Sequence, residues 1–191
     1  MALVANLATS HDQGQSLVTF VEVLQACTKR VSGLLLVLAL AACYPTYNWR
    51  EVPVADGLAV MAFPGKVESA EREMELAGIE VTFVLAGTQV QDTIFSVGHA
   101  QLPMDTSEAQ RQAVQRSLVD SLTAGIGQQA PLAAYEGEAF TLQAQARDMP
   151  MTMFAQVLIH YDVAIRVVAW GPSDSLTNEI GQEFMRSLRL R

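Results

Sequence analysis

Apolar and polar side chains alternate along much of the chain between residues 57 and 101, a pattern typical of β-strands with one buried face. The run from 57 to 63 is almost wholly apolar. The segment from 66 to 76 places glutamates opposite apolar residues, with a helix as the competing interpretation. Two more strands follow, whose shared faces hold Ile79, Val81, Phe83 and Leu85, and then Thr93, Phe95, Val97 and His99. We therefore expect four strands, with Gly87 contributing to the turn between the last two.

The period changes after residue 104, where the sequence Asp105-Thr106-Ser107-Glu108 offers helix N-caps and an acidic first turn. Ser107 and Gln110 have the spacing of a capping box. Apolar residues then recur at four-residue steps, at Val114, Leu118, Leu122 and Ile126. These features predict an amphipathic helix that ends at Gly125 and Gly127, followed by a loop from 128 to 137.

Alternation returns between residues 140 and 170 and predicts three strands, with a tight turn at His160-Tyr161-Asp162. Gly171 to Asp174 then interrupts the pattern, and Ser173 and Ser175 are expected to cap a final helix. The apolar face of that helix holds Leu176, Ile180, Phe184 and Leu188. The chain is thus predicted to have an α+β fold, in which an antiparallel β-sheet packs against two main helices. We expect a single domain over 53–191, after an extended linker at 43–52.

This order of elements resembles that of small PsbP-like exported lipoproteins. The residues that carry the resemblance are Trp49, near the start of the domain, and the closing Phe184-Met185-Arg186-Ser187-Leu188-Arg189-Leu190, which has the form F-x-x-S-L-x-L. Proteins of that shape are mostly binding or assembly factors. By analogy of fold, the resemblance implies a non-enzymatic module without a cofactor.

An uncharged apolar run from Val31 to Ala42 follows Lys29 and Arg30 and ends in small residues, as a secretory signal does. As a helix it would be about 18 Å long, too short to cross a hydrocarbon core of about 30 Å. The stretch Leu40-Ala41-Ala42-Cys43 resembles the bacterial lipobox, in which the cysteine is lipidated before cleavage just ahead of it. We therefore expect a signal peptide at 29–42. Residues 1–28 exceed what a signal needs, and we interpret them as a non-native N-terminal extension.

The lipobox resemblance implies that Cys43 carries acyl chains and that membrane lipid is its partner. Two or more chains, at about 0.8 kcal/mol per buried CH₂, anchor a protein durably. Tyr44 follows the cysteine at the position where an aspartate marks inner-membrane retention in enterobacteria. This favours an outer-membrane lipoprotein that faces the periplasm, with an envelope protein as a partner to consider. Cys27 would leave with the signal, so the exported domain would have no disulfide or zinc pattern.

Charge narrows the choice of partners. The chain has 12 Lys and Arg against 20 Asp and Glu, a net charge of −8. Residues 1–42 contain two of each sign, so the remainder has 12 − 2 = 10 basic and 20 − 2 = 18 acidic groups. An acidic domain is repelled by phosphate backbones, which argues against nucleic acid as a partner.

Three methionines, Met149, Met151 and Met153, form the one unusual cluster of candidate ligands. In an extended strand they project to one side at spacings of about 7 Å. Soft thioethers in an exported protein suggest Cu(I), with His160 as a further ligand, so a periplasmic copper-handling protein is the alternative function. The competing interpretation is that the methionines fill the core, and their alternation with Val157 and Ile159 favours it.

The remaining candidates are weaker. His99 and His160 each close a predicted strand, where histidines are usually half-exposed and structural. Four glutamates, Glu68, Glu71, Glu73 and Glu75, could serve hydrolytic chemistry or a weak Ca²⁺ site, but a run this regular is typical of a solvated face. No GxSxG, HExxH or phosphate-loop motif occurs. A hydrolase therefore ranks last, and we expect a protein that is not an enzyme.

Overall fold

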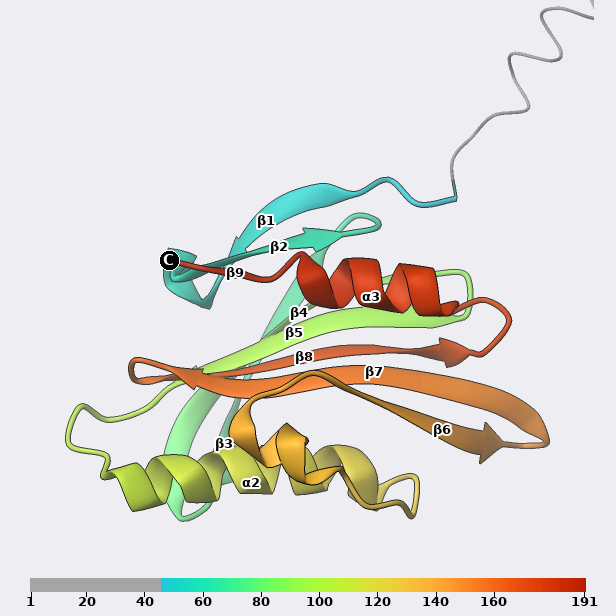
Figure 1. Ribbon diagram of the computed structural model, residues 1–191. Coiled ribbons are helices and arrows are strands. Elements are labelled where there is room, and N and C mark those ends of the chain that lie inside the picture. Colours follow the sequence, from blue (N-terminus) through green and yellow to red (C-terminus); the bar gives the residue numbers. More distant parts are fainter. Residues whose placement is uncertain (1–45) are drawn as a thin grey trace, which may run out of the picture. The chain divides into compact units, whose positions relative to one another are not determined.

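The computed structural model describes residues 46–191, which fold into two antiparallel sheets and two α-helices (Figure 1). The predicted α+β class is thereby confirmed. The elements in chain order are β1 (Arg50–Val54), η1 (Ala55–Gly57), β2 (Ala59–Phe63), β3 (Glu68–Leu76), β4 (Ile79–Val90), β5 (Thr93–Gln101), α2 (Glu108–Ala124), η2 (Leu132–Glu136), β6 (Phe140–Ala146), β7 (Met149–His160), β8 (Val163–Pro172), α3 (Asn178–Arg186) and β9 (Arg189–Leu190).

The larger sheet has the strand order β3-β4-β5-β8-β7-β6, and every neighbouring pair is antiparallel. Tight hairpins join its sequential strands, and their turn residues include Ala77, Gly78, Arg147 and Asp148, all with positive φ. Such left-handed turns match the twist of the strands they join. The pairing of β5 with β8 places side by side two segments that are far apart in sequence, and α2 lies between them in the chain.

Each face of this sheet packs against a different layer. One face lies against α3 and the smaller sheet β1-β2-β9, around a core that includes Phe63, Phe95 and Phe184. The other face lies against α2 and η2, around a core that includes Phe83, Val114 and Leu118 (Figure 1). Successive side chains of each strand point to opposite faces, so the strands contribute to two cores, one on each side of the sheet. Within residues 46–191, no helix combines the length and apolarity needed to cross a bilayer.

Both helices begin at a capped residue. The Ser107 side chain accepts a hydrogen bond from the backbone N–H of Gln110, and the side-chain oxygen of Gln110 accepts one from the backbone N–H of Ser107, so the predicted capping box is confirmed. The expected caps of the last helix were wrong, because α3 starts later and Thr177 caps it by accepting from the N–H of Ile180. The strand β8 continues through Pro172, and a turn that includes Ser173 and Ser175 separates it from the helix.

Two boundaries differ from those expected. Residues 50–54 form β1 rather than linker, and the rings of Tyr47 and Trp49 pack at 6.3 and 6.2 Å from the ring of Phe95, so these residues belong to the folded domain. Gly87 lies within β4, paired with Ser96, and the turn falls after Val90. In both places, pairing with a neighbouring strand extends the element beyond what the local sequence indicates.

Candidate functional site

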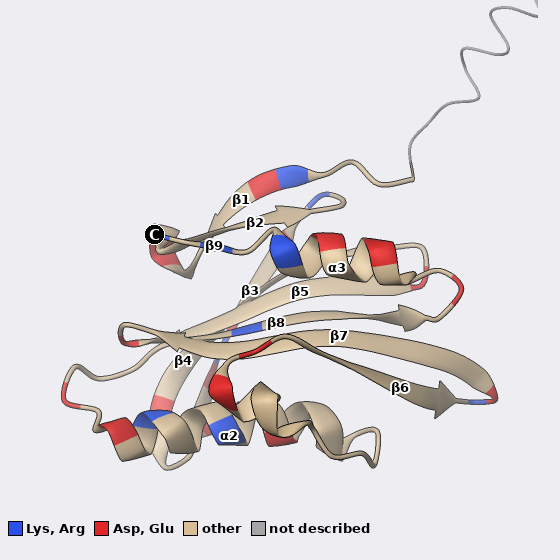
Figure 2. Ribbon diagram, viewed as in Figure 1, with Lys and Arg blue, Asp and Glu red and all other residues tan. Residues whose placement is uncertain are grey.

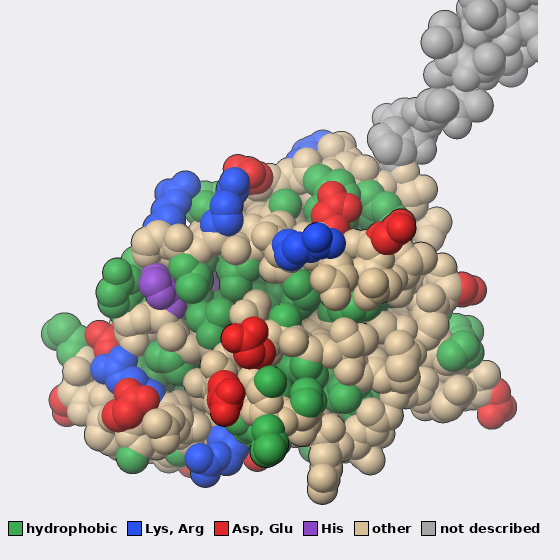
Figure 3. Space-filling model, in the orientation of Figure 1, with side chains coloured by type: hydrophobic (Ala, Val, Ile, Leu, Met, Phe, Trp, Pro, Cys, Tyr) green, Lys and Arg blue, Asp and Glu red, His purple; other side chains and the backbone are tan. Residues whose placement is uncertain are grey.

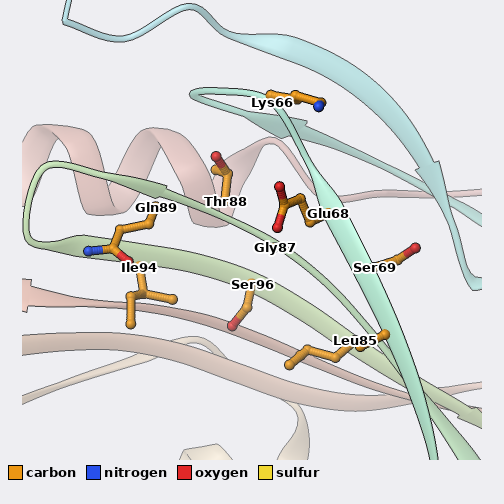
Figure 4. A pocket seen from close by; sticks show the side chains of 10 residues that line it. Lys66, Glu68, Ser69, Leu85, Gly87, Thr88, Gln89, Ile94 and Ser96 are labelled. Carbon is orange, nitrogen blue, oxygen red and sulfur yellow. The ribbon is translucent and has the colours of Figure 1, made fainter.

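Helix α2 covers only part of its side of the large sheet. Beyond it lies a surface that we call the open face, formed by Leu85, Ile94, Ser96, Arg166, Val168 and Trp170. Leu85 is 38% exposed and Ile94 is 45% exposed, so large apolar side chains of this face meet solvent. Figure 4 shows Leu85, Ile94 and Ser96 on neighbouring strands with their side chains on the same side of the sheet.

The open face is hollowed. One hollow, of about 490 Å³, extends from Lys66 and Glu68 at the start of β3 to Ile94 and Ser96 on β5 (Figure 4). A second, of about 300 Å³, lies between Arg72, Phe83 and Arg166. Both are lined by Ala70 and Leu85, so they adjoin. Their volumes are in the range of small-molecule sites.

Arg166 stands out within this surface. Figure 2 shows β5, β6, β7 and β8 almost free of Lys, Arg, Asp and Glu, and Arg166 is the one such residue in those four strands. Its guanidinium carbon lies 5.1 Å from the centre of the Phe83 ring, a cation–π distance. The ring itself lies over Gly98, where an added Cβ would be 2.3 Å from Phe83 Cζ. Gly98, Phe83 and Arg166 therefore form a stack, and the position at its base requires glycine.

The charge of Arg166 is not neutralised by an ion pair. The two ion pairs within residues 46–191 join Arg111 to Asp162, at 2.5 Å, and Arg189 to Glu51. Burial lowers the pKa of Arg166 from its usual value, and the guanidinium of Arg72 lowers it further. An arginine nevertheless stays protonated in a protein. The open face thus contains a partly desolvated guanidinium whose N–H groups can donate hydrogen bonds to a ligand.

The structure separates the proposed copper ligands. Met153 and Met151 are buried, Met153 within the core under α2, while Met149 is 50% exposed at the start of β7. His160 closes the same strand, seven residues beyond Met153, a distance of about 24 Å along a strand. Its Nε2 lies 2.9 Å from the carbonyl oxygen of Arg191. The methionines and the histidine therefore do not form one site, and no observation favours copper.

The four glutamates are also divided. Alternation along β3 places Glu68 on the side of the open face, whereas Glu71, Glu73 and Glu75 lie on the opposite side. All four are exposed, as a solvated surface predicts, and Glu73 accepts a hydrogen bond from Thr82 at 2.7 Å. Within residues 46–191, no group of three or more His, Cys, Asp or Glu side chains could hold a metal ion.

His99 is buried rather than half-exposed, at 8% exposure, because β5 lies inside the six-stranded sheet and continues past His99 to Gln101. Its Nδ1 has no hydrogen-bond partner within the described part of the chain. Burial lowers the pKa of His99 from 6.5, and the carboxylates of Asp56 and Glu71 partly oppose that shift. The side chain is therefore held as the neutral imidazole near neutral pH.

This burial predicts a pH-dependent stability. The unfolded chain takes up the His99 proton near pH 6.5, and the folded chain does so only at lower pH. The contribution of His99 to the free energy of unfolding is therefore complete above pH 6.5 and is lost as the pH falls through the folded pKa. We expect urea denaturation between pH 7.5 and pH 5 to show a smaller loss of stability in His99→Gln than in the wild type. His160→Gln is the matched control, and an equal loss in wild type and His99→Gln would contradict the prediction.

Sequence reasoning missed the open face and Arg166. The available signal was a single charge inside the apolar strand Val163-Ala164-Ile165-Arg166-Val167-Val168. The predicted lipid attachment site, Cys43, lies outside the described residues.

No protein-family model matches the chain, and no curated protein matches it. Solved structures to which it is similar include cyanobacterial PsbP (CyanoP) from Synechocystis sp. PCC 6803, with 9% identity and a TM-score of 0.42, over 78% of this chain and 96% of that one. They also include the Ran-binding protein Mog1p from Saccharomyces cerevisiae, with 12% identity and a TM-score of 0.40, over 75% of this chain and 96% of that one. At these values neither similarity bears on function.

Proposed function

We propose that the chain is a lipoprotein of the bacterial envelope, anchored through Cys43 and facing the periplasm, whose domain is a non-enzymatic binding or assembly module. The observation that carries the binding role is the open face, a hollowed and partly apolar surface with an unpaired arginine. A hollow lined by apolar side chains together with a few polar groups is typical of ligand sites. We favour the outer membrane as its location, because Tyr44 rather than an aspartate follows Cys43.

The anchor would be short. Tyr47 already packs against the domain core, and Cys43 is four residues earlier. Four extended residues span at most about 14 Å. A lipid on Cys43 would therefore hold the domain close to the membrane surface rather than on a long tether.

A lipid on Cys43 would also hold one particular end of the domain near the bilayer. The backbone N–H of Asn48 donates to the carbonyl oxygen of Pro64, at 2.9 Å, so the chain enters the domain beside the turn between β2 and β3. Lys66, two residues after Pro64, lines the larger hollow of the open face (Figure 4). One end of the open face would thus lie next to the anchor.

Binding through a sheet edge is less favoured at β3. This edge strand has exposed charges on both of its faces, namely Glu68, Glu71, Arg72, Glu73 and Glu75. Charged side chains of this kind keep edge strands from pairing with other chains. The open face is therefore the better surface for a ligand or partner.

One experiment in cells tests both parts of the proposal. A photoreactive phenylalanine analogue replaces Leu85 on the open face, in cells that are also labelled with radioactive palmitate. We expect palmitate to be incorporated and a crosslinked adduct with an envelope component to form after illumination. In the Cys43→Ser background, palmitate incorporation should disappear and the adduct should be strongly reduced.

The matched control places the same analogue at Thr82, which is exposed on the opposite face of the same strand. An adduct of equal yield from Thr82 would show that crosslinking does not report on the open face. Absence of palmitate from the wild-type chain would refute the anchor, and absence of any adduct specific to Leu85 would refute the binding role.

A further inference from the structure

We infer that the open face binds an amphiphile, an acyl chain that ends in a carboxylate or phosphate group, with the anionic group at Arg166. The inference rests on the proposed function and names the class of ligand for the same surface. Three features of the structure support it. Arg166 has no ion-pair partner, an apolar strip lies beside it, and one end of that strip is close to the point where the chain enters the domain.

The arginine supplies the anion site. Its guanidinium lies against the Phe83 ring, which orients the side chain but takes none of its hydrogen-bond donors. Arg72 lines the same hollow, and its guanidinium donates a weak hydrogen bond to the sulfur of Met74, at 3.9 Å. Because Arg72 and Arg166 line the same hollow, an anion bound there is attracted by two guanidinium groups. Carboxylates and phosphates match the planar guanidinium with paired hydrogen bonds.

The apolar strip supplies the site for the chain. From the level of Arg166 it passes along Leu85, Val168 and Ile94 toward Gln89 at the end of β4. Four residues of strand separate Leu85 from Gln89, a length of about 14 Å. Gly87 and Ser96, paired across the middle of the strip, are small and leave the hollow open. A straight acyl chain fits a strip that is narrow, apolar and open to solvent on one side.

The charge of the domain argues against a free anion as the ligand. The residues after 42 carry eight more acidic than basic groups, and Glu68 also lines the larger hollow. A small anion would be repelled by this surface unless another interaction retains it. Burial of an apolar chain along Leu85 and Ile94 provides that interaction. Binding therefore needs both the anionic group and the acyl chain of the ligand.

The position of the strip favours a ligand that partitions into membranes. Its far end lies at Gln89, and Lys66, which lines the same hollow, is next to the turn beside which the chain enters the domain. If Cys43 anchors the protein, the short connection would hold this end near the bilayer, and an amphiphile could pass between membrane and strip without crossing the rest of the domain. Lys66 adds a positive charge at that entrance.

The affinity experiment uses the full chain carrying Cys43→Ser and Trp49→Phe, so that Trp170 on the open face is the remaining tryptophan. Its fluorescence is titrated with dodecanoate, dodecyl phosphate and dodecanol below their micelle concentrations, and with inorganic phosphate. We expect saturable binding of dodecanoate and dodecyl phosphate, weaker binding of dodecanol, and none of inorganic phosphate. Arg166→Gln should raise Kd for both anionic amphiphiles at least about tenfold, because a charge-assisted pair is lost, and leave dodecanol unchanged.

Matched variants separate the parts of the site. Arg50→Gln removes the same charge from an exposed position on β1 and should change no Kd. Arg166→Lys keeps the charge without the paired donors and should give an intermediate Kd, which also covers the case in which Arg166→Gln folds poorly. Leu85→Gln should weaken all three twelve-carbon ligands.

The outcomes are distinct. Equal Kd values for dodecanoate in the wild type and Arg166→Gln would overturn the inference, as would dodecanol binding as tightly as dodecanoate. Binding of inorganic phosphate alone would reduce the site to one for an adventitious ion and would also overturn it. If no amphiphile binds but the Leu85 analogue forms its adduct in cells, the ligand class is wrong and the proposed function stands. If both fail, the binding role of the open face fails with them.

Discussion

Phe184→Ala is expected to lower the free energy of unfolding by about 3–5 kcal/mol, the usual cost of removing a buried aromatic side chain. The ring of Phe184 is fully buried on α3, and it lies edge-to-face with Phe63 of β2, at 5.7 Å, and with Phe95 of β5, at 5.1 Å. It therefore joins the helix, the small sheet and the large sheet. Domains of this size are stable by about 5–15 kcal/mol, so the variant should retain little margin.

Urea denaturation followed by circular dichroism measures this change. Leu132→Ala, at a side chain that is 84% exposed, is the control and should change stability by no more than about 0.5 kcal/mol. Phe184 lies on the side of the sheet away from Arg166, so folded Phe184→Ala should bind dodecanoate as the wild type does. A loss of stability below about 1 kcal/mol would show that the two sheets and α3 do not share this core.

The class of the fold was predictable because each layer imposes its own period on the sequence. Val114 and Leu118 recur at the spacing of a helix that buries one face, and both are buried under the sheet. The strands β6, β7 and β8 follow their predicted alternation, with the one turn at Tyr161 and Asp162 as expected. Successive side chains of a strand point to opposite faces, so those of β7 and β8 enter two cores, one on each side of the sheet.

Elements that depend on distant partners were not predictable. The strand β9 has only two residues, Arg189 and Leu190, and exists because it pairs with Val60 and Ala59 of β2. A strand of two residues is too short to show a periodic pattern of apolar and polar side chains. Likewise, Arg50 to Val54 has the composition of a linker with a proline, and becomes β1 through its pairing with β2. The smaller sheet as a whole therefore arises from tertiary pairing rather than from local pattern.

The open face lay beyond sequence reasoning for a similar reason. Gly98 and Arg166 are neighbours only because β5 pairs with β8 across the sheet, and Phe83 reaches them from β4. Alternation assigns each residue to a face, but it does not give the order of the strands. The methionines were prominent in the sequence because they are close in the chain. Arg166 was inconspicuous because its partners are not.

Gly98→Ala is expected to cost about 1–3 kcal/mol of stability and to weaken the binding of anionic amphiphiles. The added methyl carbon would be 2.3 Å from Phe83 Cζ and 2.4 Å from Cε1, well inside van der Waals contact, so the ring must move. Phe83 is only 4% exposed, and its surroundings leave it little room. Because Arg166 lies against the same ring, displacement of Phe83 also displaces the guanidinium. Urea denaturation and the dodecanoate titration measure the two effects on one sample.

A double-mutant cycle shows whether contact with the Phe83 ring causes the loss of stability in Gly98→Ala. Phe83→Leu removes the ring and leaves space above Gly98, so Gly98→Ala should cost less in that background, by about 0.5–3 kcal/mol of interaction energy. Gly125→Ala is the control, because nothing lies within 4 Å of a Cβ built there. Additive losses of stability would mean that Gly98 and Phe83 act independently. A Kd for dodecanoate that is unchanged in Gly98→Ala would mean that Arg166 does not depend on the ring for its position, and the stack would then be a feature of the core alone.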